Sequence, residues 1–569
     1  MIDACMKDIV RKYVLKNAVD FNGKANPKVV LGLVLKENPA LKGNVTTVMA
    51  QINTVAQEVE SLSLDSIKSE LDRYGPIIVE QKPIVQGPLK ALPNAEMGKV
   101  VVRIAPSPSG PLHIGHAYGT SLNYEYAKMY QGKLLLRIED TNAENIYPQA
   151  YELIERDARW LTENGVESVY AQSDRLEMNY KYVRDLIDRG HVYICTCDAD
   201  AWREMKNQGR PCSCRSLEGK EQQKRFLMMF KEYAEGEAVV RFKTDIAHKN
   251  PAMRDFPIMR VVEHVHPKTG SSKRLWPLMI FSVAIDDHEM GVTHVLNGKD
   301  HADNAMKERI IMEALGWKTP EYKHWGRINF EGFTLSTTQT KLAIEQGKYH
   351  SWEDIRIPFL PALRRRGYQP GAFRRFAIEI GLSLNDKTVL IDEFWKNINA
   401  FNKEIVDPKA NRCFFVQDPI TVRIPGVNTR RVHLQRHPSF LERGVRELEL
   451  GEDIYMSKKD IGLLEEGKIH RLIEGYNFVI EKGAFKFHSE GYEHYKSAPN
   501  RGMIIQWLPT KAELMRVEVL LDDGSTVAGF GEPLMRDLPV GEIVQLERYY
   551  FARVDSNNKK MIMLWYLHQ

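Results

Sequence analysis

Two histidines three positions apart, His113 and His116, stand where their side chains could hold a triphosphate. They belong to the eleven-residue segment Pro-Ser-Pro-Ser-Gly-Pro-Leu-His-Ile-Gly-His, residues 106–116. The prolines and Gly110 stiffen and sharpen this turn, and Gly115 allows close backbone approach where a helix would begin. Backbone N–H groups at a helix start favour an anion, so the turn is suited to gripping the phosphates of ATP.

The segments on either side of the turn predict the elements that would position it. A β-type run covers residues 100–105, a helical pattern covers 117–130, and a second β-type run covers 134–139. Strand, turn, helix and strand in this order form the βαβ unit of a nucleotide-binding sheet. We therefore expect a Rossmann-like α/β domain in which the turn leads from the first strand into the helix.

The turn resembles the HIGH signature of class I aminoacyl-tRNA synthetases, in the form used by the glutamyl and glutaminyl group. Nucleotidyltransferases that activate cytidine nucleotides also carry a HxGH turn, but they are far smaller and lack the segments that follow it here. The resemblance implies ATP with Mg²⁺ as cofactor and a two-step reaction. L-glutamate would form an adenylate and then pass to the terminal ribose of tRNA(Glu), with tRNA(Gln) as a second acceptor open to such an enzyme.

The resemblance also implies roles for individual residues. The ATP site would contain Ser107, His113, Gly115 and His116, with Ser336, Thr337, Thr338 and Lys341 in a second nucleotide loop. The glutamate site would contain Arg103, Ala105, Ser107, Glu139, Met279 and Asn297. Arg103 would bind a substrate carboxylate and Glu139 the α-ammonium. A plain cross-strand ion pair between Arg103 and Glu139 is the alternative interpretation.

The second nucleotide loop departs from the family's Lys-Met-Ser-Lys-Ser pattern. Its counterpart is Thr-Leu-Ser-Thr-Thr, residues 334–338, after Gly332-Phe333, so neither family lysine is present. Lys341 is the next cationic residue and could reach the leaving pyrophosphate, although Gln339 intervenes. Mg²⁺ bound with ATP would carry much of the missing charge.

The amino-acid pocket departs from the family at three positions. Asn297 replaces an arginine that helps to bind glutamate, Ile280 replaces an asparagine of many relatives, and Tyr118 replaces a common arginine. A pocket that loses a buried cation and a polar amide should bind a dianionic substrate less well, because an unpaired buried charge is costly.

Two other functions therefore stay open. A glutaminyl-tRNA synthetase would favour Asp-Thr-Asn after its second strand, as residues 140–142 read here, but that branch usually has Asp where Glu139 stands. It also lacks a double Cys-x-Cys knuckle. An inactive tRNA-binding paralogue is favoured by Asn297, by Gln339 and by the lysine-poor loop.

Four of the six cysteines form two Cys-x-Cys pairs separated by 14 residues. They are Cys195, Cys197, Cys212 and Cys214. The polar segment between them can fold back as a knuckle, and four thiolates gathered in this way suit a tetrahedral structural Zn²⁺. Disulfides, which need an oxidising compartment, and four free thiols are the alternatives. We expect the isolated Cys5 and Cys413 in hydrophobic cores.

Periodicity and the resemblance together predict a multidomain α/β and β protein of six regions. These are a helical N-terminal extension (1–95), the first half of a Rossmann-like catalytic domain (96–194), an acceptor-end-binding insertion with the cysteine knuckle (195–285), the second catalytic half (286–345), a helical stem-contact region (346–406) and two anticodon-binding β-barrels (407–569). Period-two alternation with Asp-Gly at 523–524 indicates hairpins in the last region. The helical extension and the β-barrels resemble archaeal-type glutamyl-tRNA synthetases, whereas the bacterial enzymes end in helices.

A basic stretch in the predicted stem-contact region could bind RNA. Alone, such a charge run would be read as a solvated face, but behind a synthetase core we expect contacts with tRNA phosphates. The candidate residues are Arg364, Arg365, Arg366, Arg374 and Arg375.

Composition sets outer bounds. At 569 residues the chain is too long for one core, and a net charge of +4 from 79 basic and 75 acidic residues is only weak evidence for a nucleic-acid partner. No run of 18 apolar residues occurs, so no membrane span is expected. The first residues carry an acid and lack a long apolar core, which is unlike a secretory signal. We expect a cytoplasmic monomer whose partners are tRNA and L-glutamate.

Overall fold

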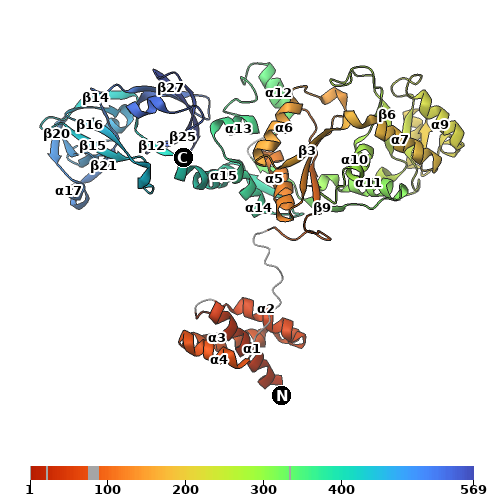
Figure 1. The fold of residues 1–569 in the computed structure, drawn as a ribbon, viewed down its shortest axis with the longest axis horizontal. Helices are drawn as coiled ribbons and strands as arrows, with labels where there is room; N and C mark the ends of the chain where they lie inside the picture. The colour runs from red at the N-terminus through yellow and green to blue at the C-terminus, as the bar shows by residue number, and fades with distance from the viewer. Residues whose placement is uncertain (1, 21–22, 75–88, 332–334) are drawn as a thin grey trace. The chain divides into compact units, whose positions relative to one another are not determined.

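The computed structural model describes residues 2–20, 23–74, 89–331 and 335–569 (Figure 1). The chain divides into two compact units, Met1–Ile84 and Val85–Gln569. The predicted boundary at residue 95 is therefore too late. Leu89 and Leu92 pack in the core of the second unit, where the Leu92 N–H donates to the Tyr130 hydroxyl at 2.9 Å.

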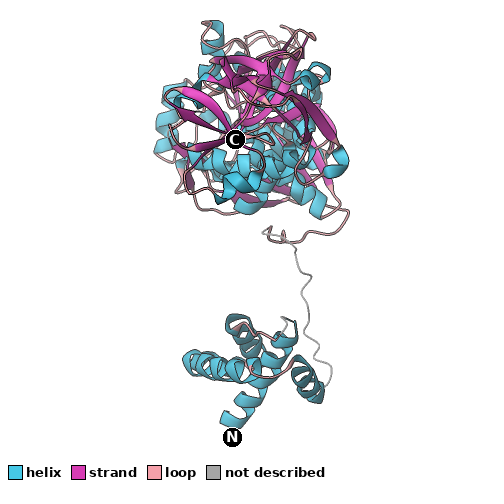
Figure 2. Cartoon of the chain, turned by 90° about the vertical axis from the view of Figure 1, so that its left-hand side faces the viewer, coloured by secondary structure: helices cyan, strands magenta, loops and turns pink. Residues whose placement is uncertain are grey.

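The regular elements of the first unit are all helices within its described residues, joined by short loops (Figure 2). Its α-helices are α1 (Ile2–Asp20), α2 (Pro27–Glu37), α3 (Val45–Glu60) and α4 (Leu64–Leu71). Apolar residues at helical spacing, such as Val10 and Val14 on α1 and Ile52 on α3, meet in one core. Arg11 of α1 donates to Glu70 of α4 and to Glu58 of α3, which joins three of the helices on the outside.

The predicted βαβ unit is present in the second unit. Strands β1 (Val101–Ile104), β2 (Lys133–Ile138) and β3 (Val166–Ala171) form a parallel sheet in that order, with α5 (Ile114–Met129) and α6 (Ala150–Leu161) as the crossovers. Strand β8 (His294–Gly298) follows the other edge of β1, where the Thr293 N–H donates to Val101 O at 3.0 Å. Strand β9 (Glu321–Trp325) pairs in parallel with β8. The carboxyl ends of β1, β2 and β8 thus lie together, which is where open α/β sheets bind ligands.

The insertion is an antiparallel sheet covered by helices. Its strands are β4 (Val192–Cys195), β5 (Val239–Phe242), β6 (Pro257–Val261) and β7 (Leu275–Pro277), and its helices include α7 (Leu176–Asp188), α8 (Ala199–Asn207) and α9 (Gly219–Met228). Both predicted boundaries of this region cut through elements. Residue 195 ends β4, and the boundary at 285 falls inside α10 (Met279–Glu289), which continues toward α11 (Ala302–Ala314).

Helices connect the catalytic sheet to the C-terminal region. They are α12 (Thr337–Glu345), α13 (Leu360–Arg366), α14 (Pro370–Ile380) and α15 (Ile391–Val406), with the parallel strands β10 (Ile328–Glu331) and β11 (Lys387–Leu390) beside them. Apolar residues of α14 and α15, among them Phe373 and Phe394, extend the same core that α5 and the sheet build.

The C-terminal region is predominantly β, as the period-two pattern predicts. A seven-stranded sheet runs in the order β12 (Asn411–Cys413), β25 (Ile543–Leu546), β26 (Tyr550–Asn557), β27 (Met561–His568), β23 (Met515–Leu520), β24 (Thr526–Gly531) and β13 (Phe415–Gln417). Smaller sheets contain β14 (Pro419–Arg423), β17 (Asp453–Ser457) and β22 (Leu508–Pro509); β15 (Arg430–Gln435) and β16 (Val445–Leu450); and β20 (Ala484–Ser489), β19 (Asn477–Glu481), β18 (Ile469–Leu472) and β21 (Arg501–Ile505).

These sheets enclose two hydrophobic cores, and neighbouring residues of one segment of chain enter different cores. Cys413 and Phe415 enter one core, while Phe414 and Val416 enter the other. Side chains of a strand alternate between its two faces, so one stretch of chain can serve both cores. The predicted Asp-Gly hairpin is confirmed between β23 and β24, where Gly524 has a φ of +88°.

Within the described residues, no helix is long and apolar enough to cross a membrane.

Candidate functional site

The histidine turn caps helix α5 with its own imidazoles. His113 Nδ1 accepts the N–H groups of Gly115 at 3.1 Å and His116 at 3.4 Å, and His116 Nδ1 accepts the His113 N–H at 3.3 Å. The two rings stack with centroids 3.8 Å apart. Because each Nδ1 accepts from a backbone N–H, each neutral ring carries its proton on Nε2.

Burial keeps both imidazoles neutral at pH 7. It lowers the pKa of His116 to about 4. Burial, and next the neighbouring His116, lower the pKa of His113 well below its ordinary value. The expectation that the first N–H groups of the helix face an anion needs correction, because His113 Nδ1 already accepts from Gly115 and His116. The Nε2–H groups, which the turn does not use, are the donors that a phosphate can use.

A cavity of about 390 Å³ opens at the carboxyl ends of β1, β2 and β8. Eight of the residues predicted for the ATP and glutamate sites line it. They are Arg103, Ala105, Ser107, Gly115, His116, Glu139, Met279 and Asn297. The structure does not place His113, Ser336, Thr337, Thr338 or Lys341 in this lining.

A buried ion network forms one wall of the cavity. Arg103 donates from Nε and Nη2 to the two carboxylate oxygens of Asp287, at 3.1 and 3.2 Å. Arg137 donates from Nη1 to Asp287 at 2.5 Å and from Nη2 to Glu139 at 3.2 Å. Burial opposes ionisation of Asp287, but Arg103 and Arg137 outweigh it and lower the pKa of this carboxyl. Within the described residues Arg103 Nη1 makes no hydrogen bond, so it is available to a ligand.

The alternative interpretation of Arg103 and Glu139 as a cross-strand ion pair is wrong. Arg103 stands opposite Leu135 in the sheet and pairs with Asp287, whereas Glu139 pairs with Arg137. Burial raises the pKa of Glu139, although Arg137 and Arg103 act against it. The carboxyl of Glu139 is therefore a poorly solvated group that would gain from a cationic ligand.

Of the three departures from the family pocket, Asn297 alone changes this cavity. Its Oδ1 lies 2.7 Å from Nδ1 of His324 on β9. Ile280 packs against the core of the insertion, and the hydroxyl of Tyr118 donates to Gly381 O at 2.8 Å. Ile280 and Tyr118 are absent from the cavity lining, so the expected loss of an amide at position 280 does not affect it.

The predicted second nucleotide loop lies against the histidine turn. Residues 332–334 fall outside the described residues, and Ser336 caps α12 by accepting the Gln339 N–H at 3.3 Å. A Cβ at Gly110 would come within 2.5 Å of Thr337, so glycine lets the two segments touch. Lys341 Nζ lies 5.4 Å from the ring centroid of Tyr147 and 3.9 Å from Glu345, beside the turn but outside the cavity lining.

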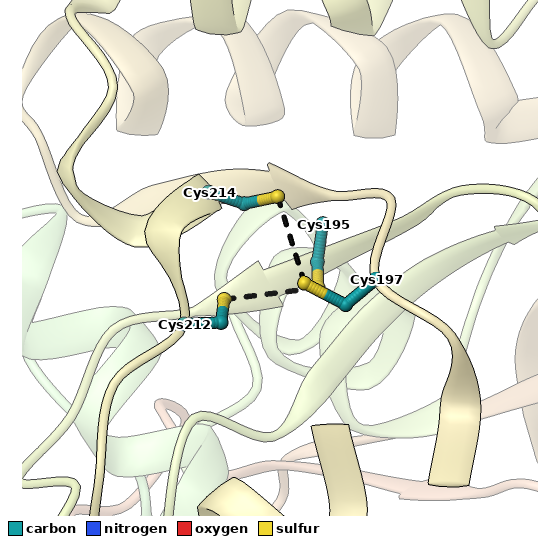
Figure 3. Close-up of side chains that lie close together, drawn as sticks. All are labelled: Cys195, Cys197, Cys212 and Cys214. Atoms are coloured by element: carbon teal, nitrogen blue, oxygen red, sulfur yellow. Dashed lines mark hydrogen bonds between the residues drawn. The ribbon is translucent and has the colours of Figure 1, made fainter. Parts of the chain in front are cut away.

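The two Cys-x-Cys pairs converge (Figure 3). All four Sγ atoms lie within 4.8 Å of one another, with Cys195 3.9 Å from Cys212 and Cys197 3.8 Å from Cys214. Disulfide sulfurs would lie about 2 Å apart, so these thiols are not bonded. Four Zn–S bonds of about 2.3 Å in a tetrahedron place the sulfurs about 3.8 Å apart, which the observed spacing matches.

The cysteine cluster already stabilises thiolate. A hydrogen bond from Cys195 lowers the pKa of Cys212 to about 5, and Arg225 donates to Cys214 Sγ at 3.4 Å. Cys413 is buried in a hydrophobic core as predicted, while the side chain of Cys5 falls outside the described part of the chain.

The five arginines predicted to contact tRNA are paired within the protein. Arg366 and Arg374 are largely buried: the first donates to Leu567 O, and the second pairs with Glu125 and Glu163. The remaining pairs are Arg364 with Asp157, Arg365 with Asp555, and Arg375 with Glu404. Arg366 and Arg374 are therefore engaged in packing within the protein, and the contact of the five arginines with tRNA stays a prediction.

Four site residues escaped prediction from the sequence. Asp287 and Arg137 hold the ion network, and Glu308 lines the cavity, where burial raises its pKa to about 7. Asp157 lies beneath the histidine turn. A usable signal existed for Asp287, because Asp286-Asp287 directly follows the apolar helical stretch that ends at Ile285, and an acid beside such a stretch is usually paired if it is buried.

The fold and the site together define an adenylate-forming synthetase with a Rossmann-like core. The family model "tRNA synthetases class I (E and Q), catalytic domain" matches residues 99–408, and the corresponding anti-codon binding domain matches residues 410–494. The chain belongs to this family, the glutamate and glutamine group of class I tRNA synthetases.

Individual relatives cover the whole chain. The chain is 42% identical to a glutamate--tRNA ligase of Methanothermobacter marburgensis over 565 residues, covering 99% of this chain and 100% of the relative. It is 43% identical to a glutamate--tRNA ligase of Pyrococcus abyssi, covering 99% of each. A crystal structure of a glutamate tRNA ligase from Elizabethkingia meningosepticum is 20% identical, with a TM-score of 0.39, and covers 55% of this chain and 70% of that chain.

Proposed function

We propose that the protein ligates L-glutamate to tRNA(Glu) in an ATP-dependent reaction through a glutamyl-adenylate. The observation that carries this proposal is the single cavity that Arg103, Glu139 and His116 line together. The cavity offers a cationic hydrogen-bond donor, a carboxylate and a neutral hydrogen-bond donor for phosphate at one edge of the sheet. Those are the groups needed to hold an amino acid beside an α-phosphate.

Each side chain has a distinct part in the first step. Nη1 of Arg103 binds a carboxylate of glutamate, and Glu139 binds the α-ammonium. The Nε2–H groups of His113 and His116 donate to phosphate oxygens and stabilise the charge that develops as pyrophosphate leaves. Mg²⁺ bound with ATP supplies further positive charge, which matters because the second loop lacks lysine at positions 336–338.

Asn297 gives the pocket a neutral donor where the family has a cation. If His324 holds Nδ1–H, it donates to Asn297 Oδ1, and the Asn297 amide N–H₂ remains free for a substrate oxygen. Lys341, 41% exposed in its side chain, would leave Glu345 and turn toward pyrophosphate when ATP binds.

The remaining regions have supporting parts in the proposal. The cysteine cluster holds one structural Zn²⁺, the insertion holds the acceptor end of tRNA, and the two C-terminal β units read the anticodon, where unstacked bases expose edges and faces. We propose tRNA(Glu) as the main acceptor, with tRNA(Gln) to be tested beside it, and a cytoplasmic monomer.

Pyrophosphate exchange in the presence of tRNA tests the proposal. ATP should incorporate labelled pyrophosphate when glutamate is supplied and not when glutamine replaces it. Exchange that depends on glutamine would identify a glutaminyl enzyme. No exchange with either amino acid would identify a tRNA-binding paralogue without activity, for which Asn297 and the lysine-poor loop are the supporting features.

A further inference from the structure

Asp157 of α6 is a fully buried acid beneath the histidine turn, with a side chain that is 0% exposed. Its Oδ2 accepts the N–H of Leu112, the residue before His113, at 3.2 Å. Its Oδ1 is buried and has no hydrogen-bond partner among the described residues, and Nη1 of Arg364 lies 3.7 Å away. A buried carboxylate that is only half satisfied is costly, so its retention calls for a reason.

Both backbone polar groups of Leu112, its N–H and its C=O, are hydrogen-bonded. While Asp157 accepts its N–H, its C=O accepts the Leu360 N–H at 2.8 Å, at the start of α13. The next N–H on the same side, that of Ile114, donates to Pro358 O at 3.2 Å. His113, the N-cap of α5, lies between these two hydrogen-bonded residues, so the position of its ring depends on them.

The cation that faces Asp157 is itself held in place. Arg364 belongs to α13, which lies next to strands β26 and β27 of the C-terminal sheet (Figure 1). The two arginines after Arg364 fasten that helix to the sheet. Arg365 donates to both oxygens of Asp555 at 2.8 and 2.9 Å, and Arg366 donates to Leu567 O at 2.9 Å. Arg364 is therefore a fixed positive charge beside the carboxylate.

The groups around Asp157 leave it close to its point of titration at neutral pH. Burial raises the pKa of Asp157 to about 7, while Arg364, Arg156 and the hydrogen bond from Leu112 favour the ionised form and Glu353 opposes it. These groups come from α6, from α13, from the turn and from the segment before α13. The ionised form predominates above pH 7 and the neutral form below it.

We propose that Asp157 is a positioning residue for ATP. Its ionised carboxylate holds the Leu112 amide and thereby fixes the positions of His113 and His116 relative to the triphosphate. The inference rests on the proposed function, because it takes the histidine turn as the ATP site. A charge-assisted hydrogen bond is stronger than a neutral one, so ionisation of Asp157 tightens the turn. ATP affinity should therefore rise with pH through the neutral range.

The test compares Asp157→Asn with the unchanged protein by titration calorimetry of MgATP at pH 6 and pH 8. An amide oxygen can still accept the Leu112 N–H, but it carries no charge. At pH 8 we expect Kd to rise about fivefold, the difference between a charged and a neutral hydrogen bond. The unchanged protein should lose affinity from pH 8 to pH 6 by a larger factor than the variant, since any titration of the nucleotide itself affects both proteins equally, while His113 and His116 stay neutral over this range.

Two further variants separate this role from a merely structural one. Glu155→Gln on the same helix removes an exposed acid that pairs with Arg159, and it should leave Kd and its pH dependence unchanged. Arg364→Gln removes the cation, which raises the pKa of Asp157 and should move the Asp157-dependent part of the pH profile to higher pH. If Asp157→Asn does not fold, the Arg364→Gln profile decides the question.

Each failure points to a different conclusion. An Asp157→Asn variant with the unaltered Kd and pH profile would overturn the positioning role alone, as would an Arg364→Gln variant without a shift. ATP binding that depends on Asp157, without glutamate-dependent exchange, would contradict the proposed function and leave the inference standing. No ATP binding by the unchanged protein would overturn both.

Discussion

His113 and His116 bind each other's backbone before they bind a ligand. Their Nδ1 atoms are committed to N–H groups of the turn, so each ring presents Nε2–H, and burial keeps the rings uncharged at neutral pH. A neutral donor in a fixed direction stabilises developing charge without having to reorient. The spacing of three residues is therefore a structural requirement of the cap as much as a requirement of catalysis.

Asn297 is the residue at which we expect activity to be most easily improved. Asn297→Arg would place a cation in the cavity beside a substrate with two carboxylates, and a charge-assisted pair should lower the KM for glutamate in pyrophosphate exchange about tenfold. Asn297→Gln, which lengthens the side chain without adding charge, is the matched control and should bring no such gain. An unchanged KM in Asn297→Arg would show that position 297 does not face the substrate carboxylate.

At the scale of elements, the insertion contains a cysteine knuckle that lies apart from its main hydrophobic core. Cys195 ends strand β4 and Cys212 lies in the segment after α8, and the two pairs meet in a small cluster with Tyr193 and Trp202. The pKa values of Cys212 and Cys214 are lowered and those of Cys195 and Cys197 are raised, because ionising all four gathered thiols would place like charges together unless a cation compensates them. A bound Zn²⁺ would tie this segment to the sheet.

Metal analysis tests this element. We expect about one zinc per chain, as a tetrahedral four-thiolate site requires, and a clear loss of it in Cys212→Ser. Amide exchange in β4 and α8 should then quicken at least about tenfold, which corresponds to a local loss of roughly 1.4 kcal/mol. Cys413→Ser, at a buried cysteine in another core, should leave the zinc content unchanged. Substoichiometric metal in carefully purified protein would contradict the zinc proposal.

Helices α13 and α14 show that the contacts of an element decide what its charged residues can bind. In the sequence, their arginines predict an RNA-binding face. In the structure, several of them fasten the helices to α5 and α6 or to the C-terminal sheet. An arginine with a carboxylate partner can still meet phosphate only by giving up that partner, which costs free energy when the pair is buried.

At the scale of the whole molecule, the chain consists of two units with separate cores. The first unit closes its own core from α1 to α4 and adds the ion pairs of Arg11 on the outside. Within the described part of the chain, the residues of that core all belong to the first unit. Such a helical unit with mainly local contacts should fold alone and quickly.

Residues 1–84 produced alone should therefore be helical and should unfold cooperatively, with a stability of about 3–5 kcal/mol, as is usual for a core of this size. Circular dichroism during thermal unfolding measures both properties. Residues 85–569, produced as the complementary piece, should keep the MgATP affinity of the full chain. A disordered 1–84 piece, or loss of ATP affinity in the complement, would show that the units depend on each other.

The sequence by itself determined the local features of this protein: the βαβ unit with its histidine turn, the helical first unit, the Asp-Gly hairpin of the C-terminal sheets and the pairing of four cysteines. Each depends on residue types within a short stretch, where turn chemistry and hydrophobic period act directly. Eight of the residues proposed for the ATP and glutamate sites also line one cavity, because the carboxyl ends of parallel strands meet at one edge of the sheet.

Tertiary structure alone decided which charges meet. Arg103 is 184 positions from Asp287 and Asp157 is 45 from Leu112, and no local pattern encodes such pairs. It also decided that Ile280 lies outside the cavity, that Arg366 is buried, that Arg374 pairs with Glu125 and Glu163, and that the first unit ends near residue 84. Burial depends on which surfaces the folded chain brings together, and burial sets the cost of a charge and so its role.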